Sequence, residues 1–179
     1  MNTKRVVLIG GPATGKSTLL KAIEAKGYPC LEEVSRQVTK AAQEEGISQL
    51  FLTKPLLFSE KLLDQRIIQF EQAATFKAPF VFIDRGIPDV VAYLDYVGEP
   101  YPQSFLEDCT KYMYDVIFVL PPWEEIHETD GERYENFEQA QAIQEALLNS
   151  YRKLGYTPVE VPKMSVKKRV DFVLNYLKK

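Results

Sequence analysis

Short apolar runs alternate along the chain with longer stretches in which apolar residues recur at helical spacing. The runs lie at residues 6–9, 28–31, 80–83, 116–120 and 156–162, and apolar runs of this length between helical stretches are typical of buried parallel strands. Helices are predicted over residues 19–26, 34–45, 55–76, 86–98, 103–113, 136–154 and 165–177, and residues 47–53 are predicted to be irregular. The alternation predicts an α/β fold, with helices on both faces of a five-stranded parallel sheet.

Residues with special backbone or capping properties mark several of the predicted helix ends. Gly27, Gly98 and Gly155 each follow a helical stretch, where glycine is the usual C-terminal cap. Asn136 with Gln139 three residues later has the form of a capping box. Ser165 is predicted to cap the last helix.

One motif after the first strand carries specific chemistry. Residues 10–17 read GGPATGKS, the spacing of a phosphate-binding P-loop, between an apolar strand and a helix. Loop amides and the helix N-terminus direct partial positive charge at a phosphate, Lys16 would reach the β- and γ-phosphates, and Ser17 would ligate Mg²⁺. A chance glycine-rich turn is the competing interpretation, and the flanking strand and helix argue against it. The predicted nucleotide contacts are Gly11, Ala13, Thr14, Gly15, Lys16, Ser17 and Thr18.

Composition narrows the class of protein. The chain has 179 residues and a net charge of −3 with a pI near 5.4. We therefore expect a single domain over 1–179 and no broad surface for nucleic acid. Cys30 and Cys109 have no metal-ligand spacing, no apolar run is long enough to span a membrane, and no signal peptide is evident, so a cytoplasmic location is expected. The sequence does not fix the oligomeric state.

An acid ends the third strand, in the sequence Phe80-Val-Phe-Ile-Asp84-Arg85. At a strand end beside a P-loop, Asp84 would hold Mg²⁺ through water or orient an acceptor hydroxyl, and Arg85 would neutralise charge on the transferred phosphoryl group. The alternative for Asp84 is a turn or cap after an ordinary core strand. Asp89 fits the first turn of a helix, where an acid complements the helix dipole.

A second group of charged residues follows the second strand. Ligands of open α/β sheets bind at the carboxyl ends of strands, so the side chains that follow this strand are candidates for an acceptor site, namely Glu32, Glu33, Ser35 and Arg36. The competing interpretation is that acids at a helix start complement its dipole, which is as good an account of Glu32. Arg66 lies within a predicted helix and would face either solvent or the site.

Residues 123–138 form a candidate lid, because this polar, charged stretch follows a strand that ends abruptly at Pro121-Pro122. Arg133 within it would act as an arginine finger, or else belong to a solvated helix start. In the last helix, Lys167, Lys168 and Arg169 are predicted to form a solvated face.

Taken together and in order, GGPATGKST, FVFIDRGIPD, FVLPPWEEI, GERYENFEQA and LGYTPVEVP resemble the NadR-like AAA-type P-loop ATPase/kinase family. The resemblance spans nearly the whole chain. It implies a three-layer, kinase-like P-loop NTPase with a helical lid, with Lys16 and Ser17 at the phosphates and Mg²⁺, Asp84 and Arg85 near the transferred group, and Arg133 in the lid.

The function expected from these residues is an Mg²⁺-dependent phosphotransferase that uses ATP, or GTP, on a small hydroxylated acceptor, for which a nucleoside-like molecule is a candidate. Glu33, Arg36 and Arg66 would line the acceptor pocket. Two alternatives stay open, a regulatory nucleotide-binding module and a plain NTPase with slow hydrolysis. The base-recognition motif N-K-x-D is absent from the sequence, which argues against a Ras-like GTPase.

Overall fold

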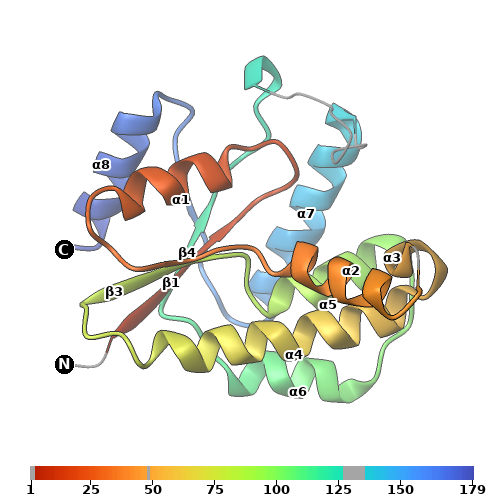
Figure 1. Ribbon diagram of the computed structural model, residues 1–179. Helices are drawn as coiled ribbons and strands as arrows, with labels where there is room; N and C mark the ends of the chain where they lie inside the picture. Colours follow the sequence, from red (N-terminus) through yellow and green to blue (C-terminus); the bar gives the residue numbers. More distant parts are fainter. Residues whose placement is uncertain (1–2, 48, 127–135) are drawn as a thin grey trace.

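The computed structural model describes residues 3–47, 49–126 and 136–179. These residues contain one five-stranded sheet in the order β2-β3-β1-β4-β5, and every pair of neighbouring strands is parallel (Figure 1). The strands are β1 (Lys4–Ile9), β2 (Cys30–Leu31), β3 (Phe80–Asp84), β4 (Val116–Val119) and β5 (Val159–Glu160). The predicted five-stranded parallel sheet is confirmed.

Helices connect the strands, as parallel pairing requires. They are α1 (Lys16–Glu24), α2 (Ser35–Glu44), α3 (Leu50–Thr53), α4 (Pro55–Ala73), α5 (Pro88–Val97), α6 (Gln103–Lys111), the 3₁₀ turn η1 (Glu124–Ile126), α7 (Phe137–Lys153) and α8 (Val166–Tyr176). None of the helices in the described part of the chain has the length and apolar character needed to cross a membrane.

Helix α3 lies where the sequence predicted irregular chain, so that part of the prediction is wrong. It is a single turn that starts after Gln49, whose φ is 53°, and ends before Pro55. Leu50 is its one buried residue. A helix this short is held by packing, and it offers no repeated apolar spacing that a pattern analysis could detect.

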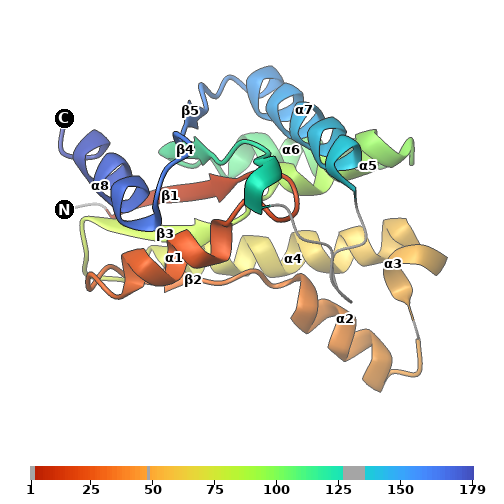
Figure 2. The same cartoon turned by 90° about the horizontal axis from the view of Figure 1, so that it is seen from above.

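The side chains of β1 alternate between two cores. Val6 and Leu8 pack with α1 and α8, whereas Val7 and Ile9 pack on the other face, which α2, α4, α5, α6 and α7 cover. Figures 1 and 2 show α1 and α8 on one side of the sheet and α4 and α6 on the other. Because both faces are covered, the strands are apolar on both sides, which explains their continuous apolar runs.

The predicted helix ends are largely confirmed. Gly27, Gly98 and Gly155 have φ values of 88°, 72° and 88°, the left-handed conformation that favours glycine. At α7, the Gln139 amide donates to Asn136 Oδ1 and the Asn136 amide donates to Gln139 Oε1, both at 2.9 Å, so the capping box is present. Ser165 stands before α8, but its side chain makes no capping hydrogen bond, so that prediction is wrong in its mechanism.

We predict that Phe118→Ala lowers the free energy of unfolding by about 3–5 kcal/mol, because truncation leaves a cavity in the core between β4, α1 and α8. Phe118 is fully buried, and its ring lies 5.4 Å from that of Tyr176. Urea denaturation measures the change. The control is Leu52→Ala, at a residue with 63% exposure, which should change the free energy by less than about 0.5 kcal/mol; equal losses in both variants would contradict the assigned core.

Candidate active site

The loop after β1 adopts the conformation that its glycines allow. Gly10 and Gly15 have φ values of 149° and 85°, and Ala13 between them has φ 55°. Gly15 is the N-cap of α1, so Lys16 is the first residue of the helix. A loop that leads into a helix N-terminus in this way presents unpaired amides at one point, which is the requirement for anion binding.

Two glycines of the loop lie against backbone of other elements. A Cβ on Gly10 would lie 2.5 Å from the carbonyl oxygen of Leu120, and one on Gly11 would lie 2.8 Å from that of Ala140 in α7. The Gly11 amide also donates to Gln144 Oε1 of α7, at 3.2 Å. The loop is therefore positioned by Leu120, the residue that follows β4, on one side and by α7 on another.

Lys16 is buried and turned back onto the loop. Its Nζ donates to the carbonyl oxygens of Gly10 and Gly11 at 2.9 and 2.7 Å. Burial, followed by the nearby Arg85 guanidinium, lowers the pKa of Lys16 to about 7, although Asp84 acts in the opposite direction. The ammonium group thus replaces part of its hydration by loop carbonyls and sits at the centre of the site.

Ser17 and Asp84 meet across the β1–β3 pair. Ser17 Oγ donates to Asp84 Oδ2 at 3.3 Å, whereas Asp84 Oδ1 is buried without a hydrogen-bond partner. Burial raises the pKa of Asp84, and Lys16 and Arg85 partly offset this. A serine hydroxyl beside a carboxylate supplies the hard oxygen donors that Mg²⁺ prefers, and the unpartnered oxygen fits a water of such an ion. The described residues hold no cluster of three or more His, Cys, Asp or Glu side chains suited to a metal.

The other predicted loop contacts differ in exposure. Thr14 is buried, and its hydroxyl donates to the Gly11 carbonyl at 3.1 Å. Thr18 is exposed on the first turn of α1, so its side chain is accessible to a ligand.

Arg85 joins an ion-pair cluster with Glu33 and Asp89. Its φ of 70° is left-handed, an uncommon conformation outside glycine. Its Nε lies 2.7 Å from Glu33 Oε2, and Arg66 Nη2 lies 3.2 Å from Glu33 Oε1. Burial alone would raise the pKa of Glu33, but Arg66, Arg85 and the Ser35 amide bring it below its ordinary value. The predicted residues Glu33, Arg66 and Arg85 are therefore brought together.

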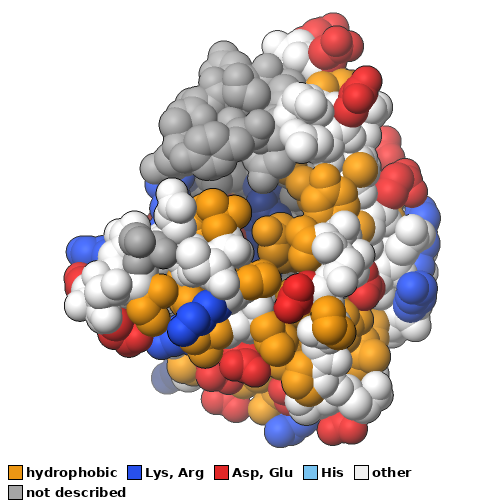
Figure 3. Space-filling view, turned by 90° about the vertical axis from the view of Figure 1, so that its right-hand side faces the viewer, with side chains coloured by type: hydrophobic (Ala, Val, Ile, Leu, Met, Phe, Trp, Pro, Cys, Tyr) orange, Lys and Arg blue, Asp and Glu red, His pale blue; other side chains and the backbone are white. Residues whose placement is uncertain are grey.

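A pocket of about 200 Å³ opens above this cluster. Its apolar wall consists of Pro12, Phe58, Leu62, Val90, Tyr93 and Ile143, and its polar groups belong to Glu33, Ser35, Ser59, Arg66, Arg85 and Asp89. Figure 3 shows this side of the molecule, where hydrophobic side chains surround a hollow with basic side chains in its depth. Arg36 is exposed on α2 and does not line the pocket.

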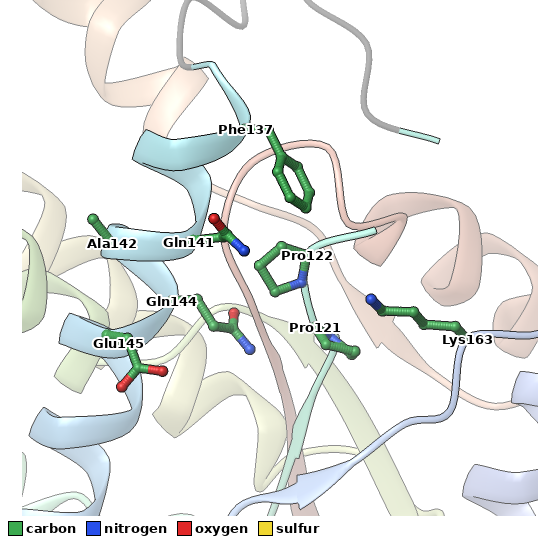
Figure 4. A pocket seen from close by; sticks show the side chains of 8 residues that line it. All are labelled: Pro121, Pro122, Phe137, Gln141, Ala142, Gln144, Glu145 and Lys163. Atoms are coloured by element: carbon green, nitrogen blue, oxygen red, sulfur yellow. The ribbon is translucent and has the colours of Figure 1, made fainter. Parts of the chain in front are cut away.

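A second pocket of about 380 Å³ lies between α7 and the segment after β4. Figure 4 shows Gln144 of α7 directed towards Pro121 in this pocket, with Lys163 on the opposite side. Gln144 is buried. Besides lining this pocket, its side chain accepts the hydrogen bond from the Gly11 amide.

Asp89 does more than complement a helix dipole. It lies in the first turn of α5, as predicted, but it is buried, and its Oδ2 accepts from the Gly86 amide at 2.9 Å and from the Tyr151 hydroxyl at 2.6 Å. Tyr151 belongs to the apolar stripe of α7, where the sequence pattern indicates core and gives no sign of a polar partner. Sequence analysis missed this pair.

The prediction that Arg169 belongs to a solvated face is wrong. The residue is 6% exposed, its Nη1 donates to the Thr14 carbonyl at 3.4 Å, and its guanidinium lies 5.8 Å from the centre of the Trp123 ring. Burial lowers the pKa of Arg169. Its spacing from Val166 and Val173, three before and four after, places it on the buried stripe of α8 and was the available signal.

The predicted lid is only partly described. Trp123 and η1 are described, but residues 127–135, with Arg133, lie outside the described residues. The lid and the arginine finger remain predictions, as does the single domain.

Comparisons with known proteins identify the family and support the fold. Residues 5–169 match the family model described as AAA domain. NadR protein in complex with NR superimposes with a TM-score of 0.75 at 19% identity, covering 99% of this chain and 50% of that one. Deoxyadenosine kinase from M. mycoides superimposes with a TM-score of 0.68 at 15% identity, covering 97% of this chain and 98% of that one. Thymidylate kinase from Candida albicans superimposes with a TM-score of 0.70 at 14% identity, covering 99% of this chain and 92% of that one. Among curated proteins the sequence has no match. The chain therefore has the P-loop kinase fold, as the sequence predicted.

We predict that Glu33→Gln lowers the free energy of unfolding at pH 7 by about 3 kcal/mol, because it leaves the buried Arg66 without its counter-charge. The pKa of Glu33 is lowered from 4.5. The stabilisation from its charge is thus complete above about pH 4.5 and is lost as the pH falls through the lower, folded-state pKa. Urea denaturation of wild type and variant should converge at acid pH.

The matched control is Glu45→Gln, which removes the exposed ion pair with Lys61. This change should cost less than about 1 kcal/mol. A loss for Glu33→Gln no larger than for the control, or one independent of pH down to pH 3, would contradict the buried pairing.

Proposed function

Because the chain belongs to the AAA domain family, we propose that it is an ATP-binding, Mg²⁺-dependent phosphotransferase that acts on a small, hydroxylated, nucleoside-like acceptor. One observation carries the proposal: two consecutive residues serve two adjoining sites. Asp84 contacts Ser17 at the P-loop, and Arg85 contacts Glu33 in the pocket. A transferase needs this arrangement, because donor phosphate and acceptor must share one reaction point.

On the nucleotide side, the amides of Ala13 to Thr18 and the N-terminus of α1 would bind the β- and γ-phosphates. Lys16 would exchange its bonds to the Gly10 and Gly11 carbonyls for bonds to phosphate oxygens. Mg²⁺, when bound through Ser17 and Asp84, would supply positive charge that neutralises these phosphates. GTP in place of ATP is compatible with every one of these contacts.

On the acceptor side, charge balance favours an uncharged molecule. Among the described residues that line the pocket, both arginines are already paired with acids, since Arg66 and Arg85 hold Glu33 and Arg85 also faces Asp89 at 3.7 Å. A phosphate or carboxylate on the acceptor would compete with Glu33 for these arginines and leave a partly buried acid unpaired. A sugar hydroxyl can instead donate to Glu33 without breaking a pair.

The apolar wall of the pocket suits a flat ring. Phe58 and Tyr93 are among its lining residues, with Leu62, Val90 and Ile143. Aromatic and branched apolar side chains bind planar rings well, while a few polar groups fix the orientation. A nucleoside offers both features, a planar base for the wall and sugar hydroxyls for Glu33.

In the transfer itself, the acceptor hydroxyl oxygen forms a bond to the γ-phosphorus while the bond from that phosphorus to the β,γ-bridging oxygen breaks. ADP leaves with the electron pair of that bond, and the hydroxyl proton passes to a carboxylate, Asp84 or Glu33. Arg85 would neutralise charge on the group in transit, and Arg133 would add to this if the lid closes over the phosphates.

We predict that one compound in a panel of nucleosides, including deoxynucleosides and nicotinamide riboside, stimulates ADP release from Mg-ATP at least about tenfold over the rate without acceptor. The corresponding 5′-monophosphates should stimulate far less, because of the charge balance in the pocket. A coupled assay for ADP measures both series. Stimulation by the monophosphates alone would overturn the acceptor class.

Tight nucleotide binding without stimulation by any compound would favour the regulatory module, and steady hydrolysis indifferent to the whole panel would favour the plain NTPase.

Asp84→Asn and Glu33→Gln separate the two halves of the site. We expect Asp84→Asn to lower kcat by about 100-fold or more while the KM for the acceptor stays close to that of wild type. Glu33→Gln should raise the KM for the acceptor by about tenfold and leave the KM for ATP unchanged. Steady-state kinetics with each substrate varied tests this, and unchanged turnover in Asp84→Asn would remove Asp84 from the mechanism.

A further inference from the structure

Helix α7 contacts both halves of the proposed site, through two buried side chains that the transfer step does not use. Gln144 Oε1 accepts from the Gly11 amide of the P-loop at 3.2 Å. Tyr151 donates its hydroxyl to Asp89 Oδ2 at 2.6 Å. The two residues are seven positions apart, two helical turns or about 10 Å along the axis, so they lie on one face.

The Tyr151–Asp89 pair supports the turn that carries Arg85. Asp89 Oδ2 also accepts from the Gly86 amide at 2.9 Å, and Asp89 Oδ1 lies 3.7 Å from Arg85 Nη1. The Tyr151 hydroxyl itself lies close to this turn, since a Cβ built on Gly86 would be 2.5 Å from it. Tyr151 is fully buried, and burial together with the Asp89 charge raises its pKa well above the ordinary value, so it remains a donor.

From these contacts we infer that α7 fixes the position of the P-loop relative to the Arg85 turn, with Gln144 and Tyr151 as positioning residues. Gln144 holds the loop at Gly11, and Tyr151 acts through Asp89 on the peptide between Arg85 and Gly86. The catalytic consequence rests on the proposed function, because it concerns transfer between the two halves. The structural part, the hold on each segment, is independent of it.

The test uses Tyr151→Phe and Gln144→Leu in the full chain, each with a matched control. Tyr156→Phe also removes one hydrogen-bonded tyrosine hydroxyl, which accepts from the backbone amide of Tyr114 at 3.0 Å and does not donate to Asp89. Gln141→Leu makes the same change as Gln144→Leu one turn earlier, at an exposed position of α7. All four variants are first compared with wild type by thermal unfolding, so that kinetic effects are judged on folded protein.

Two measurements need no acceptor substrate. We expect Tyr151→Phe to raise the hydrogen-exchange rate of the Gly86 amide by about tenfold, measured by NMR, because Asp89 loses the donor that holds it. We expect Gln144→Leu to weaken binding of Mg-ATP by about fivefold, measured by calorimetry. The Gly11 amide would lose its hydrogen-bond partner, and the P-loop would no longer be held in position against α7. Tyr156→Phe should leave the exchange rate of the Gly86 amide unchanged, and Gln141→Leu should leave the affinity for Mg-ATP unchanged.

With an acceptor in hand, Tyr151→Phe should lower kcat by about tenfold and leave the KM for ATP within about twofold of wild type. A purely structural role would instead lower thermal stability in Tyr151→Phe and Tyr156→Phe alike, with unchanged kinetic constants, and would overturn the inference. It is equally overturned if Gly86 exchange in Tyr151→Phe matches that in Tyr156→Phe. Absence of phosphoryl transfer by the wild-type protein would refute the proposed function alone. The hydrogen-exchange and nucleotide-binding measurements would still test the positioning role of Gln144 and Tyr151.

Discussion

The candidate site depends on the turn that follows β3. At its centre, both backbone polar groups of Gly86 are held: its amide donates to Asp89 and its carbonyl accepts from Arg66 at 2.8 Å. The next amide, of Ile87, donates to the Tyr114 hydroxyl at 3.1 Å. This network can hold Arg85 in a left-handed conformation that a free chain would disfavour by roughly 1 kcal/mol or more. An arginine fixed in this way needs no reorganisation when charge develops beside it.

The parallel sheet explains why one turn can serve two ligands. β3 lies between β1 and β2, so its end lies beside the P-loop on one side and beside Glu33 on the other. The backbone reversal at Arg85 then sends successive side chains in different directions, with Asp84 towards Ser17 and Arg85 towards Glu33. The strand order and one unusual φ value together create the adjacency that phosphoryl transfer would require.

Beyond the order of strands and helices, most of the individual contacts that the sequence could predict were local. The P-loop, the glycine helix ends and the capping box lie within a few residues of one another, and short-range spacing therefore identifies them. The contacts that hold the site together join residues far apart in the chain: Gln144 with Gly11 across 133 positions and Tyr151 with Asp89 across 62. Nothing in the spacing near either partner indicates such a contact. Arg169 was misassigned for a different reason. The prediction followed the charge of its side chain and not its position on the apolar stripe of α8.

The ion pairs of the pocket link stability to specificity. Burying Glu33, Arg66 and Asp89 is costly unless the charges compensate one another, and here they do. The same compensation leaves Arg66 committed to Glu33, so an anionic acceptor would gain no new attraction from Arg66 without opening this pair. Breaking a buried pair costs about 3–5 kcal/mol, which is more than most single ligand contacts return. A fold stabilised in this way would therefore discriminate against charged acceptors, under the proposed function, through the interactions that keep it folded.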